Sequence, residues 1–559
     1  MNYLPIELIS GKAAHITLID EQFLSRWSIL FDKCKHATVF QHPSFVCTWY
    51  KTYHQHWHPV IIKSCNAEGN LTALWLLAYN PETRALVHAG AHQAEYHVWL
   101  ALAGEDITFV TKAWTILKDH FDFTELHFKY LPSNLLSNIL KSIPGIGNCL
   151  IVKKFERPLL NIDENVVKSV LSRQNRKRIN QLKKIGNLEF RRITDPEEFE
   201  QVFNELISFH DFRMGAVNNI LPFQKDQLKC QFYTSLLYAK KGAFFAGVSY
   251  LNNRPIAAEL ALICNETIHL NLGMHSPFLS MHSPGKIHII QMCVYLIKEN
   301  INLLDLTPGG DFWKEKFATI HDEVAHAVVY NSGFKKKQIE LGNTIYENGK
   351  VLLTKIGIEP GKLKTSFLKM NKNFRTIAEI IKARKWSYFN RELRMYQCKK
   401  SDLLVMTNET YIRVNCNSID DLLSYKPDLT SLTCGEFLSN ANALIEKGAI
   451  SYSICLNNCL AVCSWMLTNQ TALDTTEVEQ PISLPKGSAV FFNLYSHQEL
   501  SNPDINKALI GHMLKEAFAQ NETEYIYIFV QAKNVLMRQA IETMDFKYQE
   551  SYSLRSTLN

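Results

Sequence analysis

Residues 281–286, with the sequence Met-His-Ser-Pro-Gly-Lys, have the composition of a phosphate-binding turn. They open an apolar stretch that is expected to be a helix as far as about Asn300. A small, glycine-containing turn that feeds into a helix presents unpaired backbone N–H groups and the positive end of the helix dipole. Together these hold a pyrophosphate without many charged side chains. Ser and Pro are equally typical of an ordinary helix start, so the turn alone leaves both interpretations open.

Strand-like runs on both sides of this turn would position it. Three runs precede it, at 244–251, 255–263 and 267–272, and Asn-containing turns separate them. A fourth run follows the helix at 303–306. This order predicts a meander of antiparallel strands, then the turn, a helix and one further strand.

The C-terminal part of the chain repeats this order. Its expected elements are strands at 449–456, 460–467 and 489–494, a helix at 503–519 and a strand at 525–530. Asn457-Asn458 stands between its first two strands as Asn252-Asn253 does in the central block, so we interpret it as a diverged copy. A fainter version near the N-terminus has strands at 60–63, 71–78 and 125–128 and a helix at 109–119. The sequence therefore predicts three related units.

Positive charge is concentrated in two segments. Residues 355–400 contain thirteen Lys or Arg against three Glu, and their apolar residues recur at steps of three and four, which predicts an amphipathic basic helix. Such a helix could lie on an anionic membrane or bind an acidic polymer, or it could pack on a neighbouring domain. A second basic helix is expected at 168–184, where Arg176 and its neighbours could reach a phosphate. No interleaved aromatic residues accompany this charge, which disfavours a nucleic-acid site.

The overall composition is that of an ordinary folded protein. Of the 559 residues, 46% are hydrophobic and 20% are charged, and the formal net charge is +6. No apolar run reaches the roughly 18 residues that a membrane span needs, and the first residues lack the pattern of an export signal, so we expect a cytoplasmic protein. The thirteen cysteines form no CxxC pair, so we expect neither a metal site nor a disulfide framework.

Four short segments, taken in order, resemble a known family. They are Phe40-Gln41-His42-Pro43-Ser44-Phe45, Asn175-Arg176-Lys177-Arg178, Ser283-Pro284-Gly285, and Asp305-Leu306-Thr307-Pro308-Gly309-Gly310-Asp311-Phe312-Trp313-Lys314. Together they resemble the CelD-like (BioF2-like) acetyltransferases associated with bacterial cellulose and exopolysaccharide production. These are GNAT-fold acyltransferases related to FemAB.

The resemblance implies an α/β (α+β) fold of tandem GNAT-like domains, with mixed, mostly antiparallel sheets flanked by helices. We expect a degenerate GNAT-like domain at 1–160, an acyl-CoA-binding GNAT domain at 161–340, a basic helical connector at 341–400 and a GNAT-like domain at 401–559. In the last domain, Asp545 replaces the usual Gly and the acidic segment 496–504 replaces a basic pyrophosphate loop. Because carboxylates repel a phosphate, this domain is expected to bind CoA poorly or to bind substrate.

The resemblance also places the pyrophosphate of acyl-CoA beside Ser283, Pro284 and Gly285. Pro has no backbone N–H to donate. Gly285, Lys286 and Ile287 are therefore expected to supply the donors.

Acyl transfer also needs a group that takes a proton from the acceptor. Asp305 and Asp311, with Lys314 close by, are the first candidates, and His282 and His275 are alternatives. A structural turn with a surface ion pair is the other interpretation of the two carboxylates. Among the residues assigned to substrate binding are Asp211, Arg213 and Arg176.

The expected activity is acyl transfer from acyl-CoA, with acetyl-CoA as the co-substrate, to an amino or hydroxyl group of a sugar or of a cell-envelope or exopolysaccharide precursor. The acceptor, the acyl group and the oligomeric state are not fixed by the sequence. Two alternatives stay open: a FemAB-like transferase that uses aminoacyl-tRNA, and a non-catalytic GNAT-derived scaffold. The expected partners are a small-molecule or glycan-precursor substrate, tRNA under the first alternative, and a membrane surface touched by residues 355–400.

Overall fold

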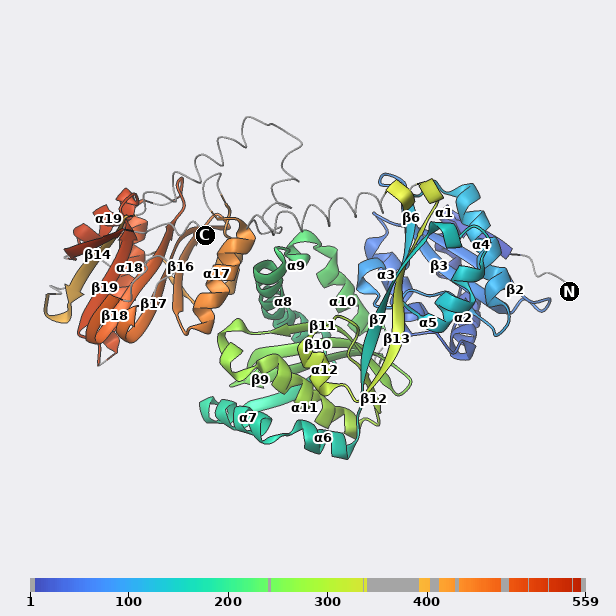
Figure 1. Cartoon of the computed structure of the whole chain (residues 1–559), viewed down its shortest axis with the longest axis horizontal. Coiled ribbons are helices and arrows are strands. Elements are labelled where there is room, and N and C mark those ends of the chain that lie inside the picture. Colours follow the sequence, from blue (N-terminus) through green and yellow to red (C-terminus); the bar gives the residue numbers. More distant parts are fainter. Residues whose placement is uncertain are drawn as a thin grey trace. The chain divides into compact units, whose positions relative to one another are not determined.

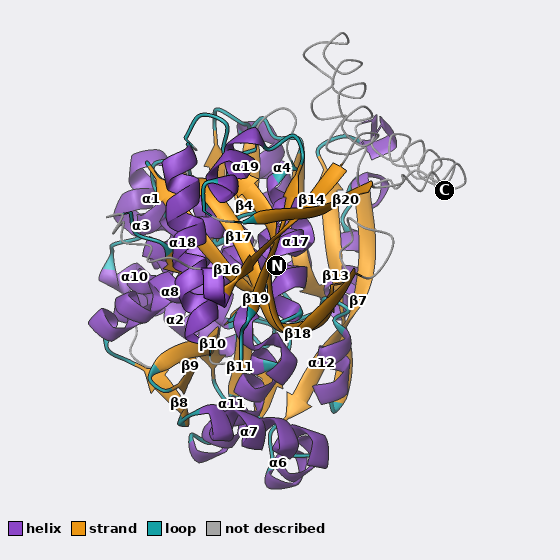
Figure 2. Ribbon diagram, turned by 90° about the vertical axis from the view of Figure 1, so that its left-hand side faces the viewer, coloured by secondary structure: helices purple, strands orange, loops and turns teal. Residues whose placement is uncertain are grey.

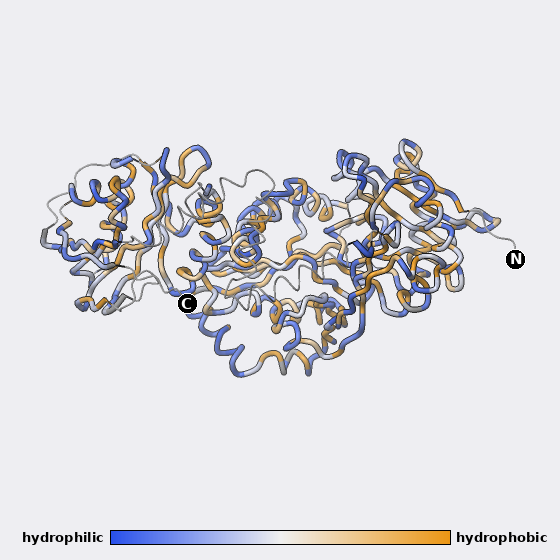
Figure 3. Tube along the Cα trace, turned by 45° about the horizontal axis from the view of Figure 1, so that its top comes forward, coloured by the Kyte–Doolittle hydropathy of each residue, from blue (hydrophilic) through white to orange (hydrophobic). Residues whose placement is uncertain are grey.

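The computed structural model describes residues 6–239, 243–334, 336–338, 392–402, 412–427, 432–473, 482–500, 502–520, 522–544 and 546–553 (Figure 1). The chain divides into two compact units. The first contains the N-terminal and central parts, and the second contains the C-terminal part together with residues 207–224 and 277–281. Figure 3 shows apolar residues concentrated along the strands and on the inner sides of the helices, as expected for packed cores.

The first unit begins with a five-stranded antiparallel sheet. Four of its strands follow the order β1-β2-β3-β4, and the short β5 pairs with β3. The strands are β1 (Ile6–Ser10), β2 (His58–Cys65), β3 (Leu71–Asn80), β4 (Ala85–His88) and β5 (Leu100–Ala101). The helices of this part are α1 (Gly11–Thr17), α2 (Glu21–Lys33), α3 (Pro43–Tyr53) and α4 (Asp106–His120). Residues 71–78 of β3 are buried on both faces, which explains their almost unbroken apolar sequence.

The rest of the first unit is built on an eight-stranded sheet with the order β6-β13-β7-β12-β11-β10-β9-β8. These strands are β6 (Glu125–Pro132), β7 (Leu150–Asn161), β8 (Leu188–Ile193), β9 (Phe244–Leu251), β10 (Arg254–Cys264), β11 (Thr267–His275), β12 (Leu303–Asp305) and β13 (Ile320–Tyr330). The helices between β6 and β13 are α5 (Ser133–Asn138), α6 (Glu164–Val170), α7 (Arg173–Ile185), α8 (Pro196–Asn218), α9 (Pro222–Lys225), α10 (Leu228–Ala239), α11 (Pro284–Lys298) and α12 (Phe312–Phe317).

Strands β7 and β13 join the N-terminal and central parts. Strand β7 lies between β12 and β13, while β13 lies between β7 and β6, and all of these pairs are antiparallel. Figure 2 shows β7 and β13 running side by side. The eight-stranded sheet therefore contains strands from both parts, and the boundary expected at residue 160 falls at the end of a strand that holds both parts together.

The second unit has a seven-stranded sheet with the order β15-β16-β17-β18-β19-β14-β20. The strands are β14 (Glu392–Lys399), β15 (Asn415–Cys416), β16 (Ile450–Leu456), β17 (Cys459–Leu473), β18 (Ile482–Ser496), β19 (Tyr525–Gln531) and β20 (Lys547–Ser553), and the helices include α16 (Ile419–Leu423), α17 (Cys434–Glu446), α18 (Pro503–Ala519) and α19 (Val535–Glu542). Most of the connector expected at 341–400 lies outside the described residues. Its last part differs from the expectation, because Glu392–Lys399 pairs with β19 and β20 as a strand.

The repeated meander predicted from the sequence is confirmed. In the central part β9, β10 and β11 are antiparallel neighbours and β12 is parallel to β11; in the second unit β16, β17 and β18 are antiparallel and β19 is parallel to β18. Both first hairpins turn through two Asn residues with positive φ, at Asn252-Asn253 and Asn457-Asn458. Asn tolerates this left-handed conformation, and tight hairpins require it.

Candidate functional site

Strands β11 and β12 separate halfway along β11. They pair only from Thr267 to His269, opposite Leu303 to Asp305. Strand β12 ends at Asp305, whereas β11 continues to His275 with β10 on its other side. Residues 270–275 therefore have one backbone edge without a strand partner in the described part of the chain, and this edge can bind a ligand.

A β-bulge lies at the point where the strands separate. Leu260 of β10 is opposite Leu272 and Ala261 is opposite Leu270, so Asn271 is the extra residue of β11. The Asn271 side chain accepts a hydrogen bond from the Tyr233 hydroxyl at 2.7 Å and donates one to the Gln93 carbonyl at 3.0 Å. A bulge redirects the local backbone groups, and here two side-chain contacts hold it in place.

Helix α11 starts beside this unpaired edge. Ser283 precedes the helix in the left-handed conformation (φ 54°), and its side chain makes no capping hydrogen bond. A Cβ added at Gly285 would lie 3.2 Å from Nδ1 of His275, so the helix start approaches the end of β11 closely and a larger residue would require the His275 ring to shift. We call Ser283 to Ile287, together with the unpaired edge of β11, the α11 cradle.

Cations from three elements surround the α11 cradle. The pKa of Lys286 is lowered by partial burial and by the nearby charges of Arg178 on α7 and Lys316 on α12. Arg176 is also on α7, where it is exposed. The cradle therefore combines uncapped helix N–H groups with several positive charges, which suits an anionic group.

Two buried imidazole nitrogens near the cradle lack hydrogen-bond partners within the described residues. They are Nδ1 of His282, directly before the turn, and Nε2 of His288 in the second turn of α11. His288 Nδ1 lies 2.8 Å from the Ser249 hydroxyl, and burial, with a contribution from His275, lowers the His288 pKa to about 3. Buried polar atoms are nearly always paired in folded proteins, so two orphaned nitrogens are consistent with a ligand at the cradle.

Asp305 is the fully buried centre of a second cluster. Its carboxylate accepts hydrogen bonds from the Tyr96 hydroxyl (2.5 Å) and from the backbone N–H of Thr307 (2.8 Å). His269 Nδ1 lies 2.9 Å away, and the Arg157 guanidinium lies 3.6 Å away. Burial alone would raise the pKa of Asp305, but the contacts from His269, Arg157 and Tyr96 lower it. The carboxylate is thus held ionised, which suits an electrostatic anchor better than a proton acceptor.

The loop after β12 links Asp305 to Asp311 and Lys314. Thr307 has a positive φ of 58°, which is unusual for a β-branched residue and costs conformational energy. Lys314 Nζ donates to both the carbonyl and the hydroxyl of Thr307 at 3.1 Å and lies 3.5 Å from the Asp311 carboxylate. The structure therefore brings these three predicted site residues together through Thr307.

A cavity of about 430 Å³ opens beside this cluster. The Asp305 cluster contributes Tyr96, Arg157, His269 and Asp305 to its wall. Lys35, His36 and Asn134 supply further polar groups. Its lining is therefore rich in hydrogen-bonding groups.

Glu259 is a further buried carboxylate that the sequence analysis did not single out. It is 6% exposed on β10, opposite Gly273, and a Cβ added at Gly273 would lie 2.8 Å from its Oε2. Its neighbours in sequence are apolar strand residues, so no local pattern marked it. No local pattern marked Tyr96, Arg157 or His269 either, because they reach Asp305 from distant parts of the chain.

Asp211 and Arg213, assigned to substrate binding from the sequence, belong to the second compact unit. Asp211 is 2% exposed, and its two carboxylate oxygens accept the backbone N–H groups of Phe223 (3.0 Å) and Gln224 (2.9 Å). This arrangement caps α9 and occupies the carboxylate. Arg213 is exposed.

In the second unit, the start of α18, which corresponds to the start of α11, is capped by a side chain. The side chain of Asn502 accepts hydrogen bonds from the N–H groups of Asp504 (3.1 Å) and Ile505 (3.0 Å) at the start of α18. Asp504 adds a negative charge in the first turn. Two donors that could hold a phosphate are thus already used; Asp545, the other expected departure, lies outside the described residues.

Comparison with known proteins agrees with this geometry in the central part. Residues 171–315 match the family model of the acetyltransferase (GNAT) domain. The match begins just before α7 and ends inside α12, so it contains the whole α11 cradle. None of the curated proteins matches the chain.

Several solved structures show partial similarity to the chain. FemX is 11% identical with a TM-score of 0.38, over 55% of this chain and 96% of that chain. A tandem GNAT protein from the clavulanic acid biosynthesis pathway is 8% identical with a TM-score of 0.36, over 59% and 99%. L-PGS from Bacillus licheniformis is 9% identical with a TM-score of 0.37, over 56% and 92%.

Among the described residues, no group of three or more His, Cys, Asp or Glu could hold a metal ion, and no helix is both long and apolar enough to cross a membrane. The family match and the antiparallel meander with its helix and parallel strand show that residues 171–315 form a GNAT acetyltransferase domain.

Proposed function

We propose that the protein transfers an acyl group, most simply acetyl, from acyl-CoA to an amino or hydroxyl group of a sugar or a cell-envelope precursor. The observation that carries this proposal is the α11 cradle: an uncapped helix start beside an unpaired strand edge. Acyl-CoA supplies an activated thioester. The protein then has to hold the carrier, orient the acceptor and take up one proton.

The residues of the cradle are suited to hold the carrier. Gly285 and Lys286 offer backbone N–H groups, whereas the N–H of Ile287, also expected as a donor, is used by the Ser283 carbonyl at 3.2 Å; Lys286 and Arg178 add positive charge close by. The unpaired edge of β11 at residues 270–275, with its bulge at Asn271, offers further backbone N–H and C=O groups where β11 and β12 separate. These donors are fixed before any ligand binds, which is the arrangement that stabilises a developing oxyanion.

His282 is the best placed of the proposed proton acceptors. It adjoins the cradle, and its buried Nδ1 has no partner within the described residues. Asp305 is held ionised by its contacts, and Lys314 is occupied by Thr307 and Asp311. We therefore propose that Asp305, Asp311 and Lys314 position the loop after β12. The alternative is that one of these three residues takes up the proton of the acceptor.

The acceptor class is inferred from the cavity beside Asp305 and from the resemblance to the CelD-like enzymes. Lys35, Asn134 and Arg157 line that cavity, and side chains of these types suit a ligand rich in hydroxyl or phosphate groups. A role in exopolysaccharide or envelope synthesis and a cytoplasmic location are parts of the same proposal.

A specific observation favours a second candidate, a transferase that uses aminoacyl-tRNA. Helix α7 exposes a basic surface close to the cradle, formed by Arg173, Arg176, Lys177, Lys183 and Lys184. A surface of this kind can follow the phosphates of a nucleic acid. It would make transfer strongly dependent on salt.

The two candidates are separated by one set of experiments. Isothermal titration of acetyl-CoA into the full chain is expected to show one site, and radiolabelled acetyl-CoA is expected to label an acceptor from a panel of amino sugars and sugar nucleotides. Ribonuclease treatment should leave this transfer unchanged. Absence of acetyl-CoA binding, together with transfer that ribonuclease abolishes, would establish the tRNA-dependent candidate instead.

A further inference from the structure

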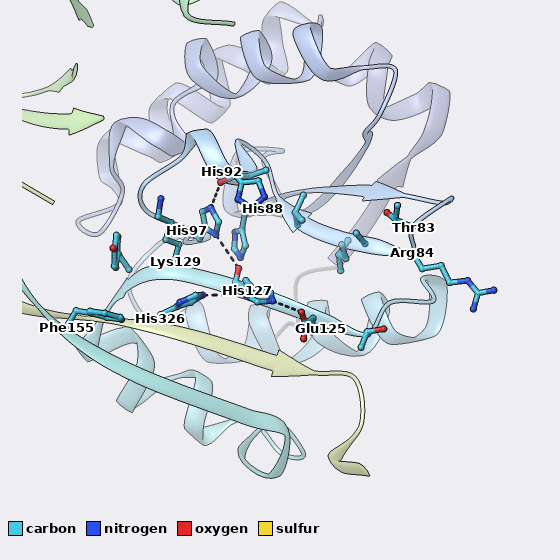
Figure 4. A pocket seen from close by; sticks show the side chains of 16 residues that line it. Thr83, Arg84, His88, His92, His97, Glu125, His127, Lys129, Phe155 and His326 are labelled. Carbon is cyan, nitrogen blue, oxygen red and sulfur yellow. Dashed lines mark hydrogen bonds and ion pairs between the residues drawn. The ribbon is translucent and has the colours of Figure 1, made fainter. Parts of the chain in front are cut away.

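A second cavity, of about 680 Å³, lies in the first unit between strands β4 and β6. It shares no lining residue with the cavity at Asp305. Its wall contains five imidazole rings, shown in Figure 4: His88, His92, His97, His127 and His326. We call it the histidine cavity. Pockets of this volume commonly bind small organic molecules.

The deep wall of the histidine cavity contains an unpaired polar group. The rings of His88 and His97 are stacked, with centroids 4.8 Å apart and 15° between their planes. His97 lies with Nε2 3.0 Å from the Ala91 carbonyl and Nδ1 3.3 Å from the His127 carbonyl. His88 is 2% exposed, and its Nε2 has no hydrogen-bond partner within the described residues.

The rim of the cavity carries the more exposed rings. Nε2 of His127 lies 2.7 Å from the Glu125 carboxylate, and its Nδ1 lies 3.4 Å from Nε2 of His326. Figure 4 shows His127 and His326 side by side on neighbouring strands, with Phe155 beyond them. Tyr130 and Phe155 add aromatic surface to the wall. The rim therefore offers two adjacent imidazoles and flat apolar surface for a ring.

Cations dominate the charges that act on these rings. Burial lowers the pKa of His92, and so do the charges of Lys129, Lys229, His127 and Lys225. Burial likewise lowers the pKa of His326, with further contributions from His127, Lys129 and Lys153.

Several charged side chains around the histidine cavity form ion pairs. Arg84 is paired with Asp122 and Lys129 with Glu95, while Glu125 is used by His127. Burial and positive neighbours thus lower the pKa of His92 and of His326. A bound anion would offset both effects and favour proton uptake.

We propose that the histidine cavity is a ligand site for a small organic anion, a ring-bearing molecule with a phosphate or carboxylate group that accepts hydrogen bonds from its imidazoles. The ring of the ligand lies against Phe155 and Tyr130, and its anionic group faces His127 and His326. The described residues hold no set of three side chains that would make this a metal site. The site is independent of the acyl-carrier chemistry proposed for α11.

Three related sugars test the proposal by isothermal titration into the full chain: glucose 6-phosphate, glucuronate and glucose. At least one of the two anions is expected to bind with a Kd of about 1 mM or tighter, and glucose at least about tenfold more weakly. The anion that binds with the lower Kd shows whether the site prefers a phosphate or a carboxylate. Binding should be tighter at pH 6 than at pH 8, and it should persist when acetyl-CoA is present.

The double variant His127→Gln, His326→Gln should bind the preferred anion with an affinity lower by about tenfold or more, since it removes both imidazoles that face the charged group. His321→Gln is the matched control, because His321 is exposed on the same strand and bonds Glu315 at 2.8 Å outside the cavity. Equal binding of all three sugars, no binding of either anion, displacement by acetyl-CoA, or an unaffected double variant would each overturn the proposal. Failure of acetyl-CoA binding alone would leave these measurements unchanged and would count against the acyltransferase proposal instead.

Discussion

A negative charge at the start of α11 should abolish most of the affinity for acetyl-CoA. Gly285 is the second residue of α11, and the charges of Arg178 and Lys316 act on its neighbour Lys286. The variant Gly285→Asp places a carboxylate where the pyrophosphate is proposed to lie. Its methyl counterpart Gly285→Ala adds only a Cβ, 3.2 Å from the His275 ring.

The size of the effect follows from the electrostatics of a partly exposed site. Two unit charges about 4 Å apart repel by about 1 kcal/mol in water and about 4 kcal/mol near a protein surface. An intermediate value of about 2–3 kcal/mol corresponds to a loss of affinity of about 30- to 150-fold. Gly285→Ala should cost less than about threefold, because a small shift of His275 relieves the contact. The Asp charge also suits the first turn of a helix, so the fold should keep its stability.

Isothermal titration of acetyl-CoA into wild type and both variants measures these losses, with urea unfolding as the control for stability. Raising the salt concentration should reduce the difference in acetyl-CoA affinity between wild type and Gly285→Asp, because salt screens the repulsion between the introduced carboxylate and the pyrophosphate. Equal affinity in wild type and Gly285→Asp would remove α11 as the carrier site. An equal loss of acetyl-CoA affinity in Gly285→Asp and Gly285→Ala would show that the added side-chain volume, and not the added charge, weakens binding.

Three further predictions follow from the caps and buried groups. Asn502→Ala should lower the stability of the second unit by about 1 kcal/mol, as loss of an N-cap does, and leave acetyl-CoA affinity unchanged; a changed affinity would place a carrier site at α18 as well. Asp305→Asn should destabilise the first unit by about 3 kcal/mol, because Arg157 and His269 lose a buried charged partner. Since the folded pKa of Asp305 is lowered, its contribution is present above the unfolded value of about 3.9 and disappears as the pH falls through the lower folded value, so urea unfolding should show a smaller acid loss in the variant. The folded pKa of His288, lowered to about 3, predicts that wild type loses stability as the pH falls below the unfolded value. That loss should begin near about pH 6.5 and approach about 1.4 kcal/mol per pH unit, and His288→Gln should reduce it; identical pH profiles in urea would contradict the assignment.

The local elements of the central and C-terminal meanders could be predicted from the sequence. Apolar runs of strand length and Asn-Asn turns define β9, β10, β16 and β17, because a hairpin is fixed by its own residues. The start of α11 was also located, although Ser283 could equally have been an ordinary cap. Its left-handed conformation without a side-chain cap favours the cradle, and this geometry is not visible in residue types.

The partners of Asp305 could not be predicted. Tyr96 is 209 residues away along the chain and His269 is 36 residues away, so no spacing rule links them. The pairing of β13 with β6 and β7 was also missed, because neighbours in a sheet are chosen by the tertiary fold and not by local pattern. The sequence could therefore nominate Asp305, but it could not show that the carboxylate is enclosed and already engaged.

The placement of β13 between β6 and β7 constrains how the chain can reach its native state. Strand β6 ends at Pro132, but β13, the strand with which it pairs, begins only at Ile320. The whole central part must therefore be synthesised before this edge of β6 is covered. An uncovered strand edge invites pairing with other chains, and contacts this distant in sequence form slowly. Halves separated at residue 160 would each expose such an edge, because β13 would be parted from β6 and β7. The eight-stranded sheet is therefore complete only in a chain that carries both the N-terminal and the central part.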